Sequence, residues 1–155
     1  MSEARENAGP LPVVPFIKTS ADGQTYIEGS VCTRCDTTHL GQRLACAKCG
    51  ARDALDVRPL SHRGTLHTFT IVHRSFPGVA VPYVSAVVDL EGGGCIKGNL
   101  INVQPDPEHI AFGMPVEVVF GDALGRKDAK GNSYVSYFFE PTRAGTAREG
   151  VGGAR

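Results

Sequence analysis

The sequence predicts a mainly β protein in which a small cysteine-rich module precedes a five-stranded barrel. Three observations lead to this architecture. The chain of 155 residues contains 19 glycines and 10 prolines, which favour short strands and turns over long helices. Four of its five cysteines form two closely spaced pairs in the first third of the chain. After these pairs, segments rich in β-branched residues alternate with turn-rich stretches, as in a small barrel or sandwich.

The overall charge restricts the classes of partner. Sixteen basic and sixteen acidic residues give a formal net charge of zero, and there is no tryptophan. This balance argues against binding of nucleic acid or of an anionic membrane by bulk electrostatics. No apolar stretch approaches the ~18 residues of a membrane span, and residues 1–10 lack the apolar region of a secretion signal. We therefore expect a soluble, cytoplasmic protein without nucleic-acid or membrane partners.

The two cysteine pairs form the most specific motif. Cys32 and Cys35 make the first C-x-x-C pair, Cys46 and Cys49 make the second, and ten residues separate the pairs. Such pairs can place four thiolates around one ion at ~2.3 Å, as a structural zinc site requires. Disulfides would need an oxidising compartment, and a redox dithiol would leave one pair unused. Iron is not separated from zinc by spacing alone, but we expect one structural Zn²⁺.

A metal held by four thiolates has no open position for a substrate, so we expect a structural rather than a catalytic role. Gly50 directly follows the second pair and suits the tight turn of a metal-binding loop. His39 lies between the pairs. It is either a spare ligand or a residue that contacts a ligand, and a solvent-exposed loop histidine is the simpler interpretation.

The chain divides into four expected parts. Residues 1–14 are polar and then proline-rich, and are expected to form a flexible arm. Residues 15–54 hold the metal module, with short strands expected at 26–28 and 44–46. Residues 55–141 are expected to form the barrel. The small, polar and glycine-rich residues 142–155 are expected to be a disordered tail.

Five strands are expected in the barrel, at residues 64–74, 83–90, 95–103, 115–121 and 134–140. In the second of these, Val84, Ala86, Val88 and Leu90 alternate with more polar positions and should face the core. Three glycines, 92–94, are expected to form a hairpin turn. A phosphate-binding loop would need a following Lys-Ser/Thr and a helix, and neither is present.

A short helical turn is expected between the third and fourth strands. Asp106 resembles a helix N-cap, and Pro107 stands at the first helical position. Residues 122–132 are expected to be a turn-rich loop. Five strands with a short helical segment after the third are the layout of an OB-type barrel, with an SH3-like barrel or a sandwich as alternatives.

The order of these motifs resembles a family of small bacterial and archaeal proteins, long labelled a domain of unknown function. The resemblance spans residues 26–141. It rests on the four cysteines, Gly-Thr-Leu-His-Thr-Phe-Thr-Ile-Val-His-Arg at 64–74, Pro-Tyr-Val at 82–84 and Gly-Met-Pro-Val-Glu-Val at 113–118. It implies a mainly β fold in which a rubredoxin-like zinc ribbon is followed by a five-stranded OB-fold barrel. The family's members are partner subunits of thiolases, acyl-CoA hydratases and aldolases.

The sequence departs from the family pattern in two places. Asp36 stands where the family has a glycine after the second cysteine, and Leu40-Gly41-Gln42-Arg43 replaces a Pro-Pro-Arg run with only the arginine kept. The proline-containing residues 10–20 cannot form the amphipathic helix with which the family usually begins. These departures affect the local hairpin and the mode of docking rather than the expected metal ligands.

The residues outside the metal module contain no recognisable catalytic motif, and the metal itself is expected to be structural. Cys95 is the only other cysteine, and its neighbours do not mark an activated thiolate, so a half-buried structural cysteine is favoured. His73 and Arg74 end the first barrel strand, either as an acid–base pair or, more simply, as contacts to a partner or to the phosphates of coenzyme A. Phe76 follows in a proline-containing loop, as an apolar side chain suited to a partner's pocket.

We therefore expect an accessory subunit that is not catalytic alone. The resemblance implies a zinc-containing subunit of a thiolase-type acyl-CoA enzyme, in a degradative route similar to β-oxidation. It would stabilise the partner and help shape the acyl-CoA site near the shared interface. An accessory subunit of a hydratase or an aldolase is the alternative. A nucleic-acid-binding module is disfavoured, because single-strand binders need a basic groove with stacking aromatic residues.

Overall fold

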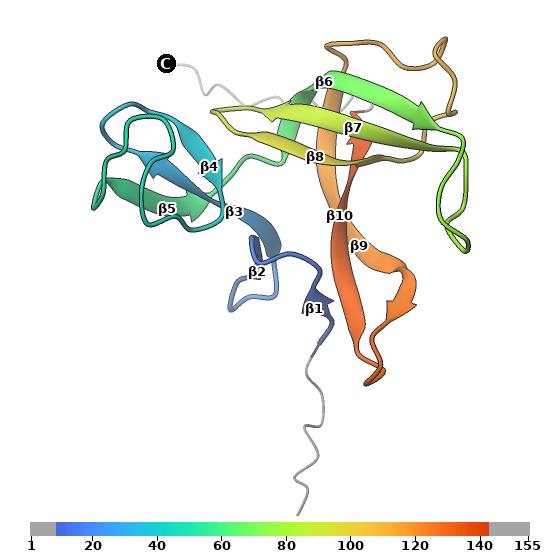
Figure 1. Cartoon of the computed structure of the whole chain (residues 1–155), viewed down its shortest axis with the longest axis horizontal. Helices are drawn as coiled ribbons and strands as arrows, with labels where there is room; N and C mark the ends of the chain where they lie inside the picture. The colour runs from blue at the N-terminus through green and yellow to red at the C-terminus, as the bar shows by residue number, and fades with distance from the viewer. Residues whose placement is uncertain (1–8, 143–155) are drawn as a thin grey trace, which may run out of the picture.

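The computed structural model describes residues 9–142, and this part of the chain contains ten β-strands and no helix (Figure 1). The strands are β1 (Leu11–Pro12), β2 (Ile17–Thr19), β3 (Thr25–Cys32), β4 (Thr38–Leu40), β5 (Leu55–Pro59), β6 (Arg63–Val72), β7 (Tyr83–Leu90), β8 (Cys95–Leu100), β9 (Pro115–Lys127) and β10 (Ser133–Pro141). No helix in residues 9–142 has the length and apolar character needed to cross a membrane.

Strands β6 to β10 form a closed barrel. Neighbouring strands are hydrogen-bonded in the order β9, β6, β7, β8, β10, and β10 pairs with β9 to close the ring. All of these pairings are antiparallel except the short parallel contact of β10 with β8, where Phe139 lies opposite Leu100. Five strands in this order confirm the predicted OB-type barrel.

A β-bulge at His67 bends β6 so that one strand can serve both sides of the barrel. Leu66 pairs with Val88 and Thr68 with Val87, which leaves His67 without an opposite residue. The inward positions therefore change phase along β6: Leu66 is buried before the bulge, whereas Phe69 and Ile71 are the positions that pack against the core after it. A bulge of this kind increases bend and twist where a sheet must curl.

The fourth and fifth barrel strands differ from the prediction. A loop was expected at residues 122–132, but β9 continues to Lys127, which pairs with Ser133 of β10. The preceding pair along the hairpin is Asp122 with Val135, so residues 123–126 form a bulge opposite the single residue Tyr134. The resulting β9–β10 hairpin projects well beyond the barrel (Figure 1).

The short helical turn predicted at residue 106 is a single hydrogen-bonded turn that does not continue as a helix. The Asp106 side chain does accept a hydrogen bond from the backbone N–H of Glu108, and its carbonyl accepts one from His109. The chain then leaves this turn, because Ile110 is drawn into the barrel core and Gly113 takes a positive φ of 77°. The capping signal was correct, and the one turn that follows it is not assigned as a helix.

The N-terminal sheet is built around β3, which pairs with β2, β4 and β5. The boundary expected after residue 54 counted residues 55–59 with the barrel, whereas β5 is hydrogen-bonded to β3. Residues 44–46 form no strand and contribute only the isolated bridge between Ala45 and Arg52. Leu11 and Pro12, expected within an unpaired arm, pair with β10. The remainder of that arm, at residues 1–8, and the expected tail from residue 143 onward lie outside the described residues.

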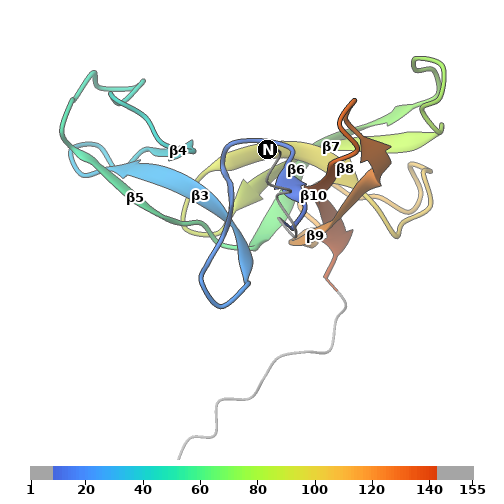
Figure 2. The same ribbon diagram turned by 90° about the horizontal axis from the view of Figure 1, so that it is seen from below.

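One hydrophobic core joins the two parts of the molecule. Ile27 of β3 and Leu60, which follows β5, belong to the same buried cluster as the barrel residues. The four alternating positions of β7 are buried in it as predicted: Val84, Ala86, Val88 and Leu90. The 92–94 turn lies against the N-terminal sheet, and a Cβ on Gly93 would come within 2.7 Å of the Thr38 hydroxyl oxygen. The sheet and the barrel therefore pack as neighbours (Figure 2).

Candidate metal centre and partner surface

Two similar turns bring the four cysteines together. Cys32 ends β3, and the backbone N–H of Asp36 donates to its carbonyl at 2.8 Å. In the second pair the backbone N–H of Gly50 donates to the Cys46 carbonyl at 2.9 Å. Asp36 and Gly50 occupy the same place in their turns and share a positive φ, of 56° and 71°. Asp36 thus adopts the left-handed conformation that glycine enters most easily, and aspartate tolerates it better than most residues.

The sulfur atoms are spaced for one tetrahedral ion. All four Sγ atoms lie within 4.8 Å of one another, and both Cys32–Cys49 and Cys35–Cys46 have Sγ–Sγ distances of 3.6 Å. Four sulfurs at about 2.3 Å from a common zinc ion would be about 3.8 Å apart. A disulfide would need about 2.05 Å, and all four cysteines are free. The cluster can therefore hold a metal ion.

The electrostatics of the cluster also suit a cation. The hydroxyl and backbone N–H of Thr37 lower the pKa of Cys35 to about 6. The backbone N–H of Ala51 lowers the pKa of Cys49, but partial desolvation and the three neighbouring cysteines outweigh it and raise this pKa to about 11. Four thiolates in so small a space repel one another, and a divalent cation between them stabilises all four charges.

His39 contacts the cluster instead of standing free in solvent. It lies on β4, which pairs with β3 so that His39 is opposite Ser30. Its Nε2 is 3.4 Å from the Sγ of Cys46, within reach of a weak hydrogen bond to sulfur. The simpler interpretation of the sequence, a solvent-exposed loop histidine, is therefore wrong. The pairing of β4 with β3 decides this contact, and that pairing is not visible in the spacing of the cysteines.

The turn after the second pair gives a first test. Gly50→Ala should lower the free energy of unfolding of the metal-loaded chain by about 1–2 kcal/mol, because a side chain at this positive φ is strained. A Cβ at Gly50 meets no atom within 4 Å, so the cost comes from the backbone alone. Gly50→Asn is the matched control and should cost less, since Asn enters the left-handed region more easily. Urea unfolding measures both, and equal costs for the two variants would contradict this explanation.

The three residues predicted to contact a partner lie far from the cysteines. His73, Arg74 and Phe76 follow β6 in the β6–β7 loop, at the end of the barrel remote from the N-terminal sheet (Figure 1). All three are exposed, and 84% of Phe76 is accessible to solvent. The structure therefore leaves the metal cluster and this loop as separate places, not one site.

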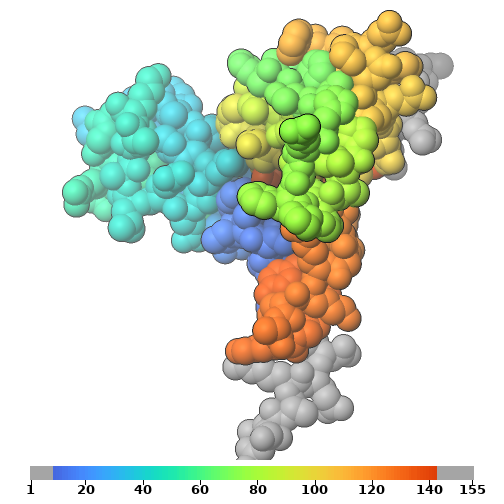
Figure 3. Space-filling model, turned by 45° about the vertical axis from the view of Figure 1, so that its right-hand side comes forward, coloured from blue at the N-terminus to red at the C-terminus, as the bar shows by residue number. Residues whose placement is uncertain are grey.

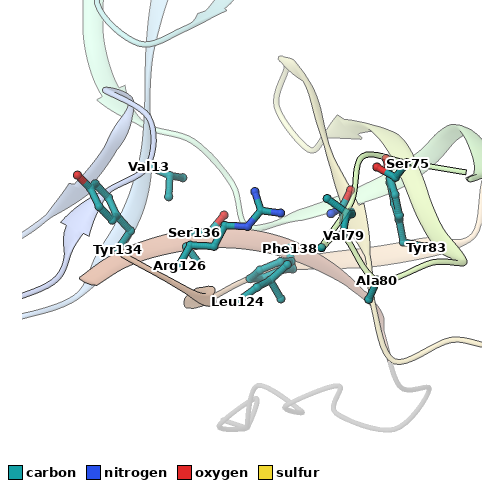
Figure 4. A pocket seen from close by; sticks show the side chains of 13 residues that line it. Val13, Ser75, Val79, Ala80, Tyr83, Leu124, Arg126, Tyr134, Ser136 and Phe138 are labelled. Carbon is teal, nitrogen blue, oxygen red and sulfur yellow. The ribbon is translucent and has the colours of Figure 1, made fainter. Parts of the chain in front are cut away.

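The same loop forms one side of an open groove of about 670 Å³. The opposite side is the β9–β10 hairpin, with Val13 at one end (Figures 3 and 4). The groove is lined by Val13, Ser75, Gly78, Val79, Ala80, Tyr83, Asn99, Ala123, Leu124, Arg126, Tyr134, Ser136 and Phe138. The hairpin's contribution was missed because residues 122–132 were expected to be a loop. Its one signal in the sequence is Asp122 three residues before Gly125, a spacing typical of side-chain-capped turns.

Cys95 lies in a small polar group on the outside of the barrel. It pairs with Asp89 across β7 and β8, and the Asp89 carboxylate also contacts Nδ1 of His67 at 2.7 Å. Partial burial and the neighbouring Asp89 charge raise the pKa of the Cys95 thiol. The carboxylate lies between the thiol and the imidazole, which is the reverse of an activated Cys–His pair.

Residues 57–121 match the family model described as the C-terminal OB-fold domain of ChsH2. A DUF35 domain-containing scaffold protein of Methanocaldococcus jannaschii is 35% identical over 95 residues, which are 59% of this chain and 65% of that protein. Its counterpart in Methanothermobacter thermautotrophicus is 30% identical over 97 residues, covering 61% of this chain and 71% of that protein. The chain belongs to the DUF35 family.

Other relatives are named as subunits of enzymes that act on acyl-CoA compounds. The benzoylsuccinyl-CoA thiolase subunit BbsA of Geobacter metallireducens is 31% identical, with 44% of this chain matched to 45% of that protein. The 3-oxo-4,17-pregnadiene-20-carboxyl-CoA hydratase alpha subunit of Mycobacterium tuberculosis is 41% identical, with 40% of this chain matched to 20% of it. Among solved structures, the Ltp2-ChsH2(DUF35) aldolase has a TM-score of 0.57 and 26% identity, covering 75% of this chain and 84% of that one.

Proposed function

We propose that this DUF35 chain is a zinc-containing accessory subunit of an acyl-CoA enzyme and is not catalytic by itself. The observation that carries the proposal is the arrangement of Cys32, Cys35, Cys46 and Cys49. Four sulfurs at these distances complete the coordination of one Zn²⁺ and leave no position for a substrate or an activated water. A metal held in this way stabilises a fold, and the fold then presents a surface to a partner.

The acyl-CoA part of the proposal rests on the relatives. A thiolase subunit, a hydratase subunit and an aldolase assembly all contain a region similar to this chain. The thiolase and the hydratase are both named for CoA thioester substrates, and a domain that recurs beside different chemistries supplies something that they share, such as stabilisation of a catalytic subunit. The OB barrel alone would not decide this, since OB folds serve many functions.

We propose a thiolase-type catalytic subunit as the partner, acting on an acyl-CoA in a degradative route. BbsA supports this assignment, because the match covers a larger share of that protein than of the hydratase subunit. An aldolase partner is the second candidate, supported by the structural likeness that extends over three quarters of this chain. His73, Arg74 and Phe76 are proposed to contact the partner or the acyl-CoA near the shared interface.

Cys95 provides a test of the accessory role. Cys95→Ala should leave the turnover of the assembled complex within a few-fold of the parent, because a thiol with a raised pKa beside a carboxylate is a poor nucleophile. Loss of an activated nucleophile would instead lower kcat by orders of magnitude. A thousand-fold loss in a complex that still assembles would make Cys95 catalytic and overturn the proposal.

Purification of the full chain with a mild affinity tag, followed by mass spectrometry, identifies its partner. We expect a thiolase-type subunit in stoichiometric amount and one zinc per DUF35 chain by metal analysis. The purified complex should cleave a 3-oxoacyl-CoA in the presence of free CoA. Recovery of an aldolase or hydratase subunit would transfer the proposal to that chemistry, and recovery of nucleic acid without an acyl-CoA enzyme would contradict it.

A further inference from the structure

We propose that the groove between the β6–β7 loop and the bulge of β9 docks a polypeptide segment of the catalytic subunit, one in which an acidic side chain lies beside apolar ones. This inference rests on the proposed function, and it names the surface through which that function would operate. Its basis is the local structure of the bulge, the charge of the groove and the apolar side chains at the groove's edge.

Because of the bulge, side chains of consecutive residues line the groove. In a regular strand these side chains would alternate between the two faces. Residues 123–126 stand opposite Tyr134 alone, and the Asp122 carboxylate holds the loop by accepting the backbone N–H of Gly125. Ala123, Leu124 and Arg126 all line the groove as a result. Figure 4 shows Arg126 extending into the space between Val13 and the loop that carries Val79. Bulges recur beside functional sites for this reason.

Leu124 has a strained backbone conformation, and its side chain contributes little to the stability of the fold. It has a φ of 59°, a region that a bulky side chain rarely occupies, and 70% of it is exposed. Glycine or asparagine would serve the same backbone with less strain, and an exposed leucine adds little to stability. Strain of this kind tends to persist where a binding surface requires it. We therefore assign Leu124 to an apolar contact with a partner.

The charge of the groove selects an acidic partner. Among the residues of the described part of the chain that line the groove, Arg126 alone is charged. Within residues 9–142 no carboxylate lies at ion-pair distance from it. The nearby Asp128 carboxylate instead accepts hydrogen bonds from Asn132 and from the hydroxyl of Tyr134 at 3.1 Å, which fixes one wall of the groove. A partner carboxylate would give Arg126 a bidentate ion pair.

The shape of the groove favours a polypeptide over a small molecule. Small-molecule sites bury roughly 70–90% of their ligand, whereas this groove lies open between the loop and the hairpin (Figure 3). Both segments also carry exposed large apolar side chains: 84% of Phe76 and 44% of Val81 are exposed in the loop, and 70% of Leu124 is exposed in the bulge. Exposed anchors around an open groove are typical of protein–protein interfaces.

The test uses the full chain and the catalytic subunit that co-purifies with it, with affinity measured by titration calorimetry. Leu124→Gly and Arg126→Glu should each raise the Kd about tenfold or more. The zinc content should be unchanged, and the melting temperature of Leu124→Gly should be equal to or above that of the parent, because glycine relieves the positive φ. Arg126→Lys should retain most of the affinity.

Leu44→Gly and Arg58→Glu are the matched controls in the N-terminal part of the chain: Leu44, in the segment between β4 and β5, is 96% exposed, and Arg58 lies on an exposed position of β5. Both should bind like the parent. The proposal that the groove is the docking site is contradicted if Leu124→Gly and Arg126→Glu bind with the affinity of the parent, or if the controls lose affinity instead. Binding of acetyl-CoA alone, seen as NMR shifts confined to groove residues, would also overturn it. If no acyl-CoA enzyme subunit co-purifies, the proposed function itself fails together with this inference.

Discussion

Cys46→Ser should remove the metal from the cysteine cluster and unfold the residues that surround it. Binding of structural zinc is worth on the order of 10 kcal/mol, comparable to the whole stability of a small domain. Within residues 9–142, the buried core around the cluster consists of Cys32, Cys46 and Ala51, with a few partly buried neighbours. So small an apolar cluster cannot keep this region folded without the bound ion. Metal analysis should find less than one zinc per chain, and NMR should show loss of dispersed signals around the cluster.

The effect should extend into the barrel. Strand β3 carries Cys32 at one end and Ile27 in the shared core, and both residues are fully buried. Loosening this strand removes apolar contacts from the barrel, so the unfolding midpoint of the whole chain should fall. Cys95→Ser is the control, because this cysteine lies outside the cluster, and it should keep both zinc and midpoint. Unchanged zinc content in Cys46→Ser would disprove the assignment of the ligands.

Phe139→Ala should destabilise the protein by about 3–5 kcal/mol, a large part of the 5–15 kcal/mol available to a domain. Phe139 is fully buried and lies opposite Leu100 where β10 meets β8. Its ring packs close above Gly98, where an added Cβ would come within 2.9 Å of the ring, and against the edge of Tyr137. The cavity left by alanine would open the core at the point where the barrel closes.

Urea unfolding followed by circular dichroism measures this loss, since the chain has no tryptophan to report by fluorescence. Phe112→Ala is the matched control: Phe112 is 70% exposed, and its ring lies beside that of Phe69. It should change the free energy of unfolding by about 0.5 kcal/mol or less. If the two variants lost similar amounts of unfolding free energy, burial of Phe139 at the closure of the barrel would not be a major source of stability.

Predictions from the sequence succeeded where the signal is local. The two C-x-x-C pairs identified a cluster whose sulfur atoms do come together, because each pair needs only its own tight turn and one hairpin between them. The alternation in β7 identified its buried face correctly, because side chains change face at every residue of a regular strand. The same rule fails in β6, where the bulge at His67 changes the phase of the pattern.

The helical turn expected at Asp106 illustrates the limit of a local signal. The carboxylate caps a turn as predicted, yet burial of Ile110 in the barrel decides the direction of the chain beyond it. His39 illustrates the same limit at the metal cluster. Its distance to Cys46 depends on the pairing of β4 with β3, and nothing in the spacing of the cysteines specifies that pairing.

The sequence by itself determined the cluster of four cysteines, the order of the barrel strands along the chain and the inward face of β7, since each follows from spacing along the chain. Only the tertiary structure decided that Phe139 meets Leu100 to close the barrel, and that the bulge at 123–126 faces the β6–β7 loop across a groove. These contacts join residues about 40 or more positions apart. Their partners are chosen by how the whole sheet curls and fills its core, which no local pattern of residues records.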